Sequence, residues 1–252
     1  MTDSDRLAGK RIAVLAADGF EQAELEAGLA ALRHAGAQAT LLALRRGRIR
    51  GMQVHQSAEL LKVDAAVDTA RAADYDGLLL PGGYIGPDLL RQSAPARDFV
   101  CDFHALGKPI AAMSHAPLVL VSCGLARGRT LTAWPGIRDD LVNAGAAWLD
   151  RDAVRDGLLL TSRGPQDADA FIREMLALFA GDAPSAATAP SDSDPPRLAP
   201  LEAPEQPLRW LSAPSIGTML SLALLGVGVV AANHSRRKKE DAPPAASAAD
   251  DG

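Results

Sequence analysis

The stretch AAMSHAPLVLVSCG, residues 111–124, contains the pattern on which the fold prediction rests. An apolar run ends at Met113, the pair Ser114–His115 follows at once, and a helical pattern begins near Ala116. A turn that leads from a buried strand directly into a helix presents its polar side chains at the carboxyl edge of a sheet, where ligands bind in such folds. Ser114 therefore occupies the position of a nucleophile.

Strand patterns and helix patterns alternate on both sides of this stretch. Short apolar runs, typical of parallel strands buried on both faces, occur at residues 11–17, 38–44, 77–83 and 108–113. The apolar residues between them recur at helical spacing: Leu25, Leu29 and Leu32; Phe99, Phe103 and Leu106; and, near the end, Phe171, Met175 and Leu178. The alternation predicts one α/β domain over residues 8–180, with a doubly wound parallel sheet.

Three shorter segments complete the predicted domain. Residues 48–57 have the pattern of a small hairpin with a Gly-containing turn, and residues 136–145 that of a short helix. Residues 153–162 contain one further strand.

The composition changes near residue 181. Residues 181–207 are rich in Pro, Ala and acidic side chains, which predicts a disordered linker. Residues 211–232 contain no charged side chain, and roughly 20 apolar residues suffice for a helix that crosses a bilayer. Four basic residues at 236–239 follow, in a tail over 233–252 that is otherwise predicted to be disordered. The sequence thus predicts a single-pass membrane protein.

The orientation in the membrane rests on two opposing signals. The basic residues after the span favour a cytoplasmic C-terminus. Residues 1–20 lack the pattern of a signal peptide, which favours a cytoplasmic globular domain. We favour the second orientation, because moving a short basic tail across the bilayer is easier than exporting a whole domain.

Charge and residue spacing give no indication of nucleic-acid binding or of a metal site. The net charge of −5 gives no indication of nucleic-acid binding. Cys101 and Cys123 lack metal-ligand spacing, and their apolar helical surroundings predict buried structural thiols. The histidines are also scattered without ligand spacing, so neither a metal nor another cofactor is predicted: His34, His55, His104, His115 and His234.

Three groups of residues are expected at the carboxyl edge of the sheet. Residues 18–21 follow the first strand, the Pro-Gly-Gly turn supplies Gly82 and Gly83, and Ser114 and His115 follow a later strand. Backbone N–H groups there would stabilise an anion or an oxyanion. Each group also has an ordinary structural explanation, and from spacing alone an N-cap role for Ser114 is favoured over catalysis.

Several segments together resemble the PfpI-like intracellular protease branch of the ThiJ/PfpI superfamily. They are FEQAELEAG (20–28), LLLPGG (78–83), the strand–Ser–His turn, residues 127–150 and VRDGLLLTSRGP (154–165). The resemblance implies a flavodoxin-like sandwich with a class I glutamine amidotransferase-like site, normally in homo-oligomers. It also implies peptidase, glyoxalase, deglycase or stress-protective roles and a small-molecule or peptide ligand.

The resemblance also assigns roles to individual residues. Glu21 matches the acidic partner of the nucleophile, Gly83 the oxyanion position, and His115 the histidine after the nucleophile. Asp88 aligns with a glutamate that a neighbouring subunit contributes. The family has Cys-His-Gly-Pro where this chain has Ser114-His-Ala-Pro, so a hydroxyl stands in place of the expected thiol.

Two functions follow from this replacement. The favoured prediction is a degenerate, membrane-anchored member with a stress-related, binding or scaffold role. The alternative is a hydrolase in which Ser114 attacks, His115 is the base and Asp88 of a neighbouring subunit orients the imidazole. Adjacent Ser and His side chains rarely meet, which counts against the alternative.

Overall fold

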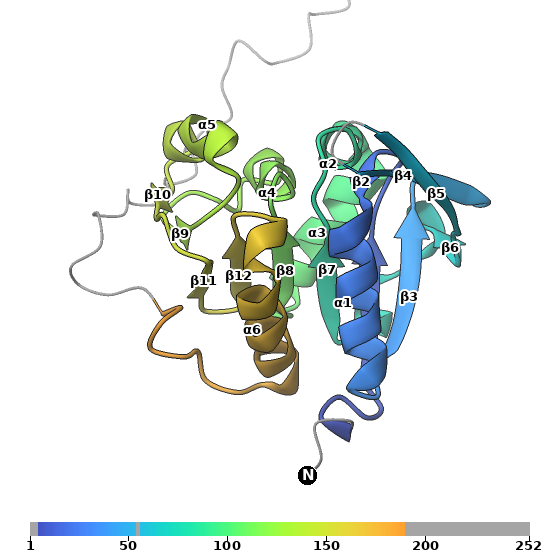
Figure 1. Cartoon of the computed structure of the whole chain (residues 1–252), viewed down its shortest axis with the longest axis horizontal. Helices are drawn as coiled ribbons and strands as arrows, with labels where there is room; N and C mark the ends of the chain where they lie inside the picture. The colour runs from blue at the N-terminus through green and yellow to red at the C-terminus, as the bar shows by residue number, and fades with distance from the viewer. Residues whose placement is uncertain (1–4, 54–55, 190–252) are drawn as a thin grey trace, which may run out of the picture. The chain divides into compact units, whose positions relative to one another are not determined.

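The computed structural model describes residues 5–53 and 56–189 (Figure 1). Seven strands form the main sheet, in the order β11-β12-β8-β7-β1-β3-β6. Their bounds are β1 (Arg11–Leu15), β3 (Gln38–Ala43), β6 (Ala65–Ala66), β7 (Gly77–Leu80), β8 (Ile110–Met113), β11 (Ala153–Asp156) and β12 (Leu159–Ser162). All neighbouring strands are parallel except β11 and β12, which pair antiparallel.

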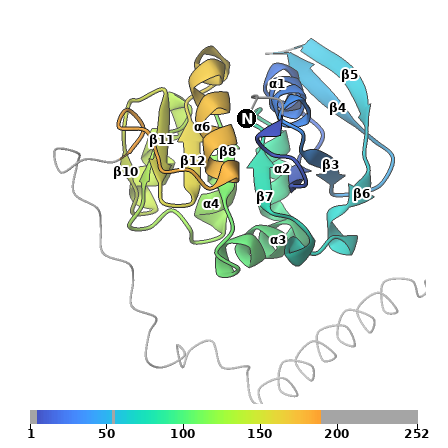
Figure 2. The same ribbon diagram turned by 90° about the horizontal axis from the view of Figure 1, so that it is seen from below.

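Helices cover both faces of this sheet. Figure 2 shows the strands between one layer that contains α1 and α6 and another that contains α3 and α4. The helices are α1 (Gln22–His34), α2 (Gly86–Gln92), α3 (Ala94–Ala105), α4 (Pro117–Ser122), α5 (Arg138–Asn143) and α6 (Ala168–Ala180). The predicted α/β fold with a mostly parallel sheet is confirmed.

The central strands are largely apolar, with β7 (GLLL) and β8 (IAAM) apolar from end to end, because each face of the sheet has its own core. On β1, Ile12 and Val14 belong to the core that α1 and α6 cover, whereas Ala13 and Leu15 belong to the core under α3 and α4. Successive side chains of a strand point to opposite faces, so a strand covered on both sides has no position for an exposed polar residue.

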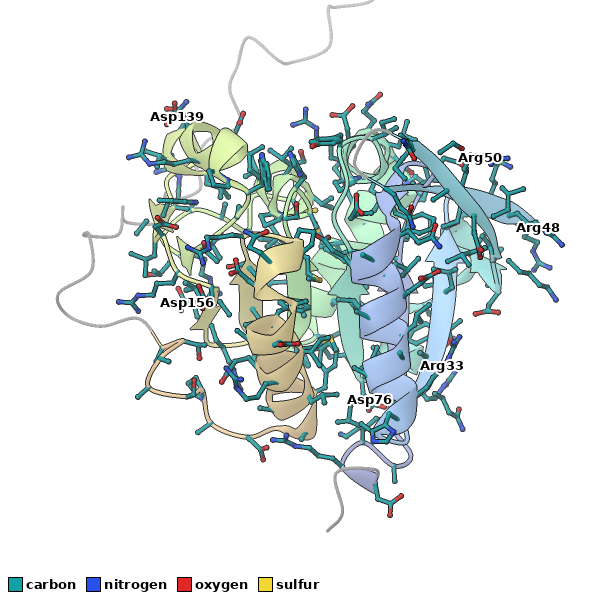
Figure 3. The ribbon with its side chains drawn as sticks, in the orientation of Figure 1. Arg33, Arg48, Arg50, Asp76, Asp139 and Asp156 are labelled. Atoms are coloured by element: carbon teal, nitrogen blue, oxygen red, sulfur yellow. The ribbon has the colours of Figure 1, made fainter. Side chains whose placement is uncertain are left out.

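Smaller strands are attached to the main domain. A hairpin of β4 (Arg48–Gln53) and β5 (Gln56–Lys62) pairs with β2 (Phe20–Glu21), so the predicted hairpin is confirmed, but its second strand is longer and Gly51 lies within β4 and not in the turn. Arg48 and Arg50 project from β4 into solvent, as Figure 3 shows, whereas Ile49 between them is buried. A second small sheet pairs β9 (Thr130–Leu131) with β10 (Ala147–Trp148).

Three details of the predicted fold are wrong. Residues 153–162 form two antiparallel strands, because the chain turns back at Gly157, whose φ of +64° favours glycine. Leu106 lies just after α3 with 51% of its surface exposed, so it is not a core residue. Cys101 and Cys123 are free thiols that are only partly buried.

The predicted membrane localisation also needs correction. No helix within residues 5–53 and 56–189 is long and apolar enough to cross a membrane. The segment 211–232, on which that prediction depended, lies outside the described residues, as does the tail 233–252.

The chain continues to pack on the domain after α6. Thr188 accepts a backbone hydrogen bond from Arg155 of β11 at 2.9 Å, and its hydroxyl donates to the buried Glu174 of α6 at 3.1 Å. This packing extends beyond residue 180, where the predicted domain ends. The remainder of the predicted linker, residues 190–207, lies outside the described residues.

Candidate functional site

The turn after β8 holds Ser114 in an uncommon backbone conformation. Its φ is +54°, the only positive φ of a non-glycine residue in the described part of the chain. The surrounding backbone fixes it there: Ser114 N–H donates to Ser162 at 3.0 Å, and Trp134 N–H donates to Ser114 at 3.0 Å. A left-handed serine persists only where neighbouring structure imposes it, and such residues cluster at functional sites.

This conformation brings the side chains of Ser114 and His115 together. The distance from Ser114 Oγ to His115 Nδ1 is 3.1 Å, which is a hydrogen bond. The N-cap of α4 is Ala116, and no side chain caps that helix. The N-cap interpretation of Ser114 is therefore wrong, and so is the expectation that these adjacent side chains do not meet.

Two aromatic rings fix the imidazole of His115. The Trp134 ring stacks on it with centroids 5.6 Å apart, and the Tyr84 ring meets it edge-on at 4.9 Å. Burial lowers the pKa of His115 below its ordinary 6.5, because desolvation disfavours the imidazolium. Near neutral pH the ring is therefore uncharged, and Nδ1 is able to accept the Ser114 hydroxyl proton.

A buried carboxyl group that is not among the predicted site residues lies beside Ser114. Glu24 of α1 is 1% exposed, and its Oε2 accepts a hydrogen bond from Gly82 N–H at 2.7 Å. Its Oε1 is buried with no hydrogen-bond partner among the described residues. Burial above all raises the pKa of Glu24 from its ordinary 4.5 to about 8, so the carboxyl is protonated at neutral pH.

The Pro-Gly-Gly turn accepts no side chain at either glycine. A Cβ on Gly82 would lie 2.5 Å from Glu24 Oε2 and 2.6 Å from Ser114 Cβ, so these two groups leave no room for a side chain at Gly82. A Cβ on Gly83, whose φ is +109°, would lie 2.5 Å from the carbonyl oxygen of Gly19. Gly83 N–H is not used in the backbone hydrogen bonds of the described residues.

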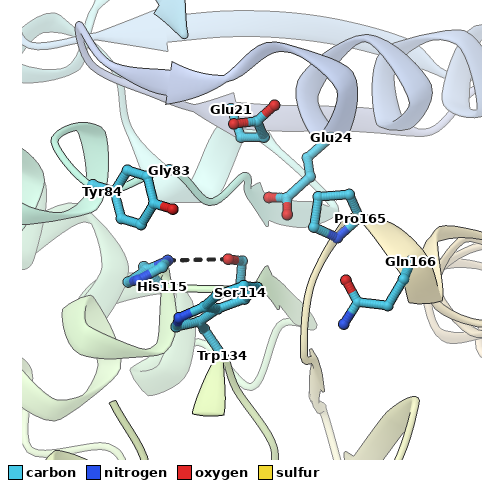
Figure 4. Close-up of a pocket in the computed structure, with 9 residues that line it drawn as sticks. All are labelled: Glu21, Glu24, Gly83, Tyr84, Ser114, His115, Trp134, Pro165 and Gln166. Atoms are coloured by element: carbon cyan, nitrogen blue, oxygen red, sulfur yellow. Dashed lines mark hydrogen bonds between the residues drawn. The ribbon is translucent and has the colours of Figure 1, made fainter. Parts of the chain in front are cut away.

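These groups line one cavity of about 230 Å³ (Figure 4). Four predicted site residues are brought together in it: Glu21, Gly83, Ser114 and His115. Five lining residues were missed: Glu24, Tyr84, Trp134, Pro165 and Gln166. Glu24 lies one helical turn after Glu21 in FEQAEL, which is the one signal that indicates its position.

The remaining predicted site residue lies elsewhere. Asp88 is on α2, where it forms an ion pair with Arg91 at 2.8 Å and accepts a hydrogen bond from Gln92. It does not line the cavity of its own chain, and neither cysteine does. In the described part of the chain, no three His, Cys, Asp or Glu side chains are grouped closely enough to hold a metal ion.

The fold and the site define an α/β protein with a polar residue on a strained strand-to-helix turn. The model of the DJ-1/PfpI family matches residues 10–178, and the chain belongs to this family.

Comparison with individual proteins agrees with the family. The chain is 36% identical over 169 residues to a deglycase of Pyrococcus abyssi, a match that covers 67% of this chain and 99% of the relative. It is 39% identical over 172 residues to protein/nucleic acid deglycase 2 of Escherichia coli, covering 68% and 98%. A two-domain protein of Anabaena variabilis, with DJ-1/ThiJ/PfpI-like and ferritin-like domains, superposes with a TM-score of 0.64 at 31% identity, covering 73% of this chain and 51% of that one.

Replacement of Gly83 tests the close approach at the Pro-Gly-Gly turn. We expect Gly83→Ala to destabilise the fold by about 3 kcal/mol or more, because the new Cβ meets backbone atoms that have no room to move. Gly47→Ala is the matched control, since Gly47 has a φ of +110° but no atom within 4 Å of a Cβ, and it should cost only about 1 kcal/mol. Urea denaturation of both variants measures the difference, and equal costs would contradict the close approach.

Replacement of Glu24 tests the buried neutral carboxyl. A folded pKa raised above the unfolded value stabilises the fold at low pH, and that contribution is lost between about pH 4.5 and 8. Glu24→Gln should therefore match the wild type near pH 5 and become more stable than it as the pH rises to 8.5. Thermal melts across this range make the comparison, with Glu26→Gln on the exposed side of α1 as the control. Parallel pH curves for the wild type and Glu24→Gln would show that Glu24 is not buried in its neutral form.

Proposed function

We propose that the protein is a hydrolase of small carbonyl or acyl compounds, of the deglycase type, in which Ser114 is the nucleophile. The observation that carries the proposal is the hydrogen bond from Ser114 Oγ to the uncharged imidazole of His115, inside a cavity. A serine hydroxyl needs an adjacent general base, and this pair supplies one. The names of the two deglycase relatives support the same class of reaction.

The cavity provides a role for each polar group in such a reaction. The Ser114 hydroxyl gives its proton to His115 Nδ1 while Oγ bonds to the substrate carbonyl carbon. The carbonyl oxygen takes up the electron pair and becomes an oxyanion, which Gly83 N–H is placed to stabilise. Figure 4 shows the Glu24 carboxyl directed toward the space above Ser114, where a protonated Oε1 would donate a second hydrogen bond.

The proposal includes an oligomer. His115 Nε2 carries the proton of the neutral ring when Nδ1 accepts from Ser114, and a carboxylate opposite Nε2 would hold this tautomer. We propose that Asp88 of a neighbouring subunit supplies this carboxylate, in line with the resemblance that implies homo-oligomers.

Covalent labelling of the full chain tests the nucleophile. A fluorophosphonate probe should label the wild type at Ser114 and leave Ser114→Ala unlabelled, because no other described serine shares the cavity with a histidine. The wild type should also release free amine from methylglyoxal-treated N-acetyl-lysine, with at least a 100-fold loss in Ser114→Ala. Ser114→Cys is the control for an intact site. Equal labelling of the wild type and Ser114→Ala would refute the proposal.

The pH dependence of the reaction tests the two titrating groups. The value of kcat/KM should rise as His115 loses its proton below pH 6.5, and fall again near pH 8 as Glu24 becomes charged. Glu24→Gln should remove the alkaline fall, because the amide stays neutral and still donates. The measurement is amine release between pH 5 and 9. If kcat/KM of Glu24→Gln still falls near pH 8, the fall belongs to the titration of another group.

A further inference from the structure

The two cysteines of the chain are neighbours in space, although 22 residues separate them in sequence. Cys101 lies on α3, and Cys123 is the C-cap of α4. Cys101 Sγ is 4.0 Å from the Cys123 carbonyl oxygen, and Cys123 Sγ is 3.6 Å from the carbonyl oxygen of Arg97, one turn before Cys101. Each thiol therefore contacts the backbone of the segment that carries the other cysteine.

We propose that Cys101 and Cys123 form an intramolecular disulfide when the protein meets a disulfide oxidant such as oxidised glutathione. Neither thiol lines the cavity at Ser114, so this reaction is separate from the proposed hydrolase. Both cysteines are only partly buried, which leaves a route for a small oxidant.

The position of each thiol sets the order of the two exchange steps. Burial, together with the neighbouring Cys101, raises the pKa of Cys123 to about 12, so little Cys123 thiolate is present to attack an external oxidant. The Cys101 thiolate attacks one sulfur of oxidised glutathione, and the first glutathione leaves as a thiolate. Cys123 then gives up its proton to a base in solution and attacks the Cys101 sulfur, and the second glutathione leaves. The protein loses two electrons and two protons, and oxidised glutathione becomes two reduced molecules.

The bond would fix one end of a helix that begins at the candidate site. Helix α4 starts directly behind Ser114 and His115, and Cys123 closes its opposite end. A cross-link between α3 and this end restricts the unfolded chain over the intervening residues. We therefore expect the oxidised protein to melt roughly 5 °C or more above the reduced protein.

Mass spectrometry of the full chain, incubated with oxidised glutathione, tests the proposal. The wild type should lose the mass of two hydrogen atoms and all reactivity toward maleimide under denaturing conditions, and dithiothreitol should restore both. Cys123→Ser should stop at one stable glutathione adduct on Cys101, and Cys101→Ser should stay largely reduced.

Three results would overturn the proposal. In the first, the wild type carries two glutathione molecules. In the second, the disulfide forms only between two chains. In the third, the folded wild type stays reduced under conditions that oxidise its urea-unfolded form. A higher melting temperature in Cys101→Ser after the same incubation with oxidised glutathione would show that the shift does not come from this bond. Fluorophosphonate labelling of Ser114 is read separately, so failure of the disulfide and failure of the hydrolase remain distinguishable.

Discussion

The hydrogen bond from Gly82 N–H to the Glu24 carboxyl is the contact on which the candidate site depends. It joins the first turn of α1 to the turn after β7, and Ser114 Cβ presses on the same glycine from β8. The start of α1, the turn after β7 and the turn after β8 therefore meet at Gly82, and no side chain at that position would fit between them. The neutral form of Glu24 follows from its burial, which raises its pKa more than the hydrogen bond from Gly82 lowers it.

The elements of the fold were predictable because both faces of the sheet are covered. A strand with a core on each side must be apolar throughout, and a helix that covers one face must repeat its apolar residues every three to four positions. The pattern did not reveal that residues 153–162 fold back on themselves. Gly157 lies between the short segments AVRD and LLLTS, and only a left-handed glycine at that point separates a hairpin from one continuous strand.

Only the site residues that follow directly after a strand of the sheet were predictable, because the ends of parallel strands lie together at one edge. Glu21, Gly83, Ser114 and His115 follow strand ends and were expected there, whereas Trp134 and Gln166 reach the cavity from segments with no such signal. The hydrogen bond between Ser114 and His115 was missed for a different reason. Extended or helical backbone turns adjacent side chains apart, and it is the φ of +54° at Ser114 that turns them together.

The proposal that Ser114 is the nucleophile is consistent with the electrostatics of the cavity. A thiolate is stabilised by a helix N-terminus, or by a positive neighbour such as an imidazolium, a lysine or an arginine, and only the first of these, the start of the short helix α4, lies beside Ser114. No lysine or arginine is among the nine residues that line this cavity, and burial disfavours the charged form of His115. A serine reacts without becoming a free anion beforehand, because the proton leaves Oγ as the new bond forms. It needs a neutral base at hydrogen-bond distance and donors for the oxyanion, and these are the roles proposed for a neutral His115, Gly83 N–H and a protonated Glu24.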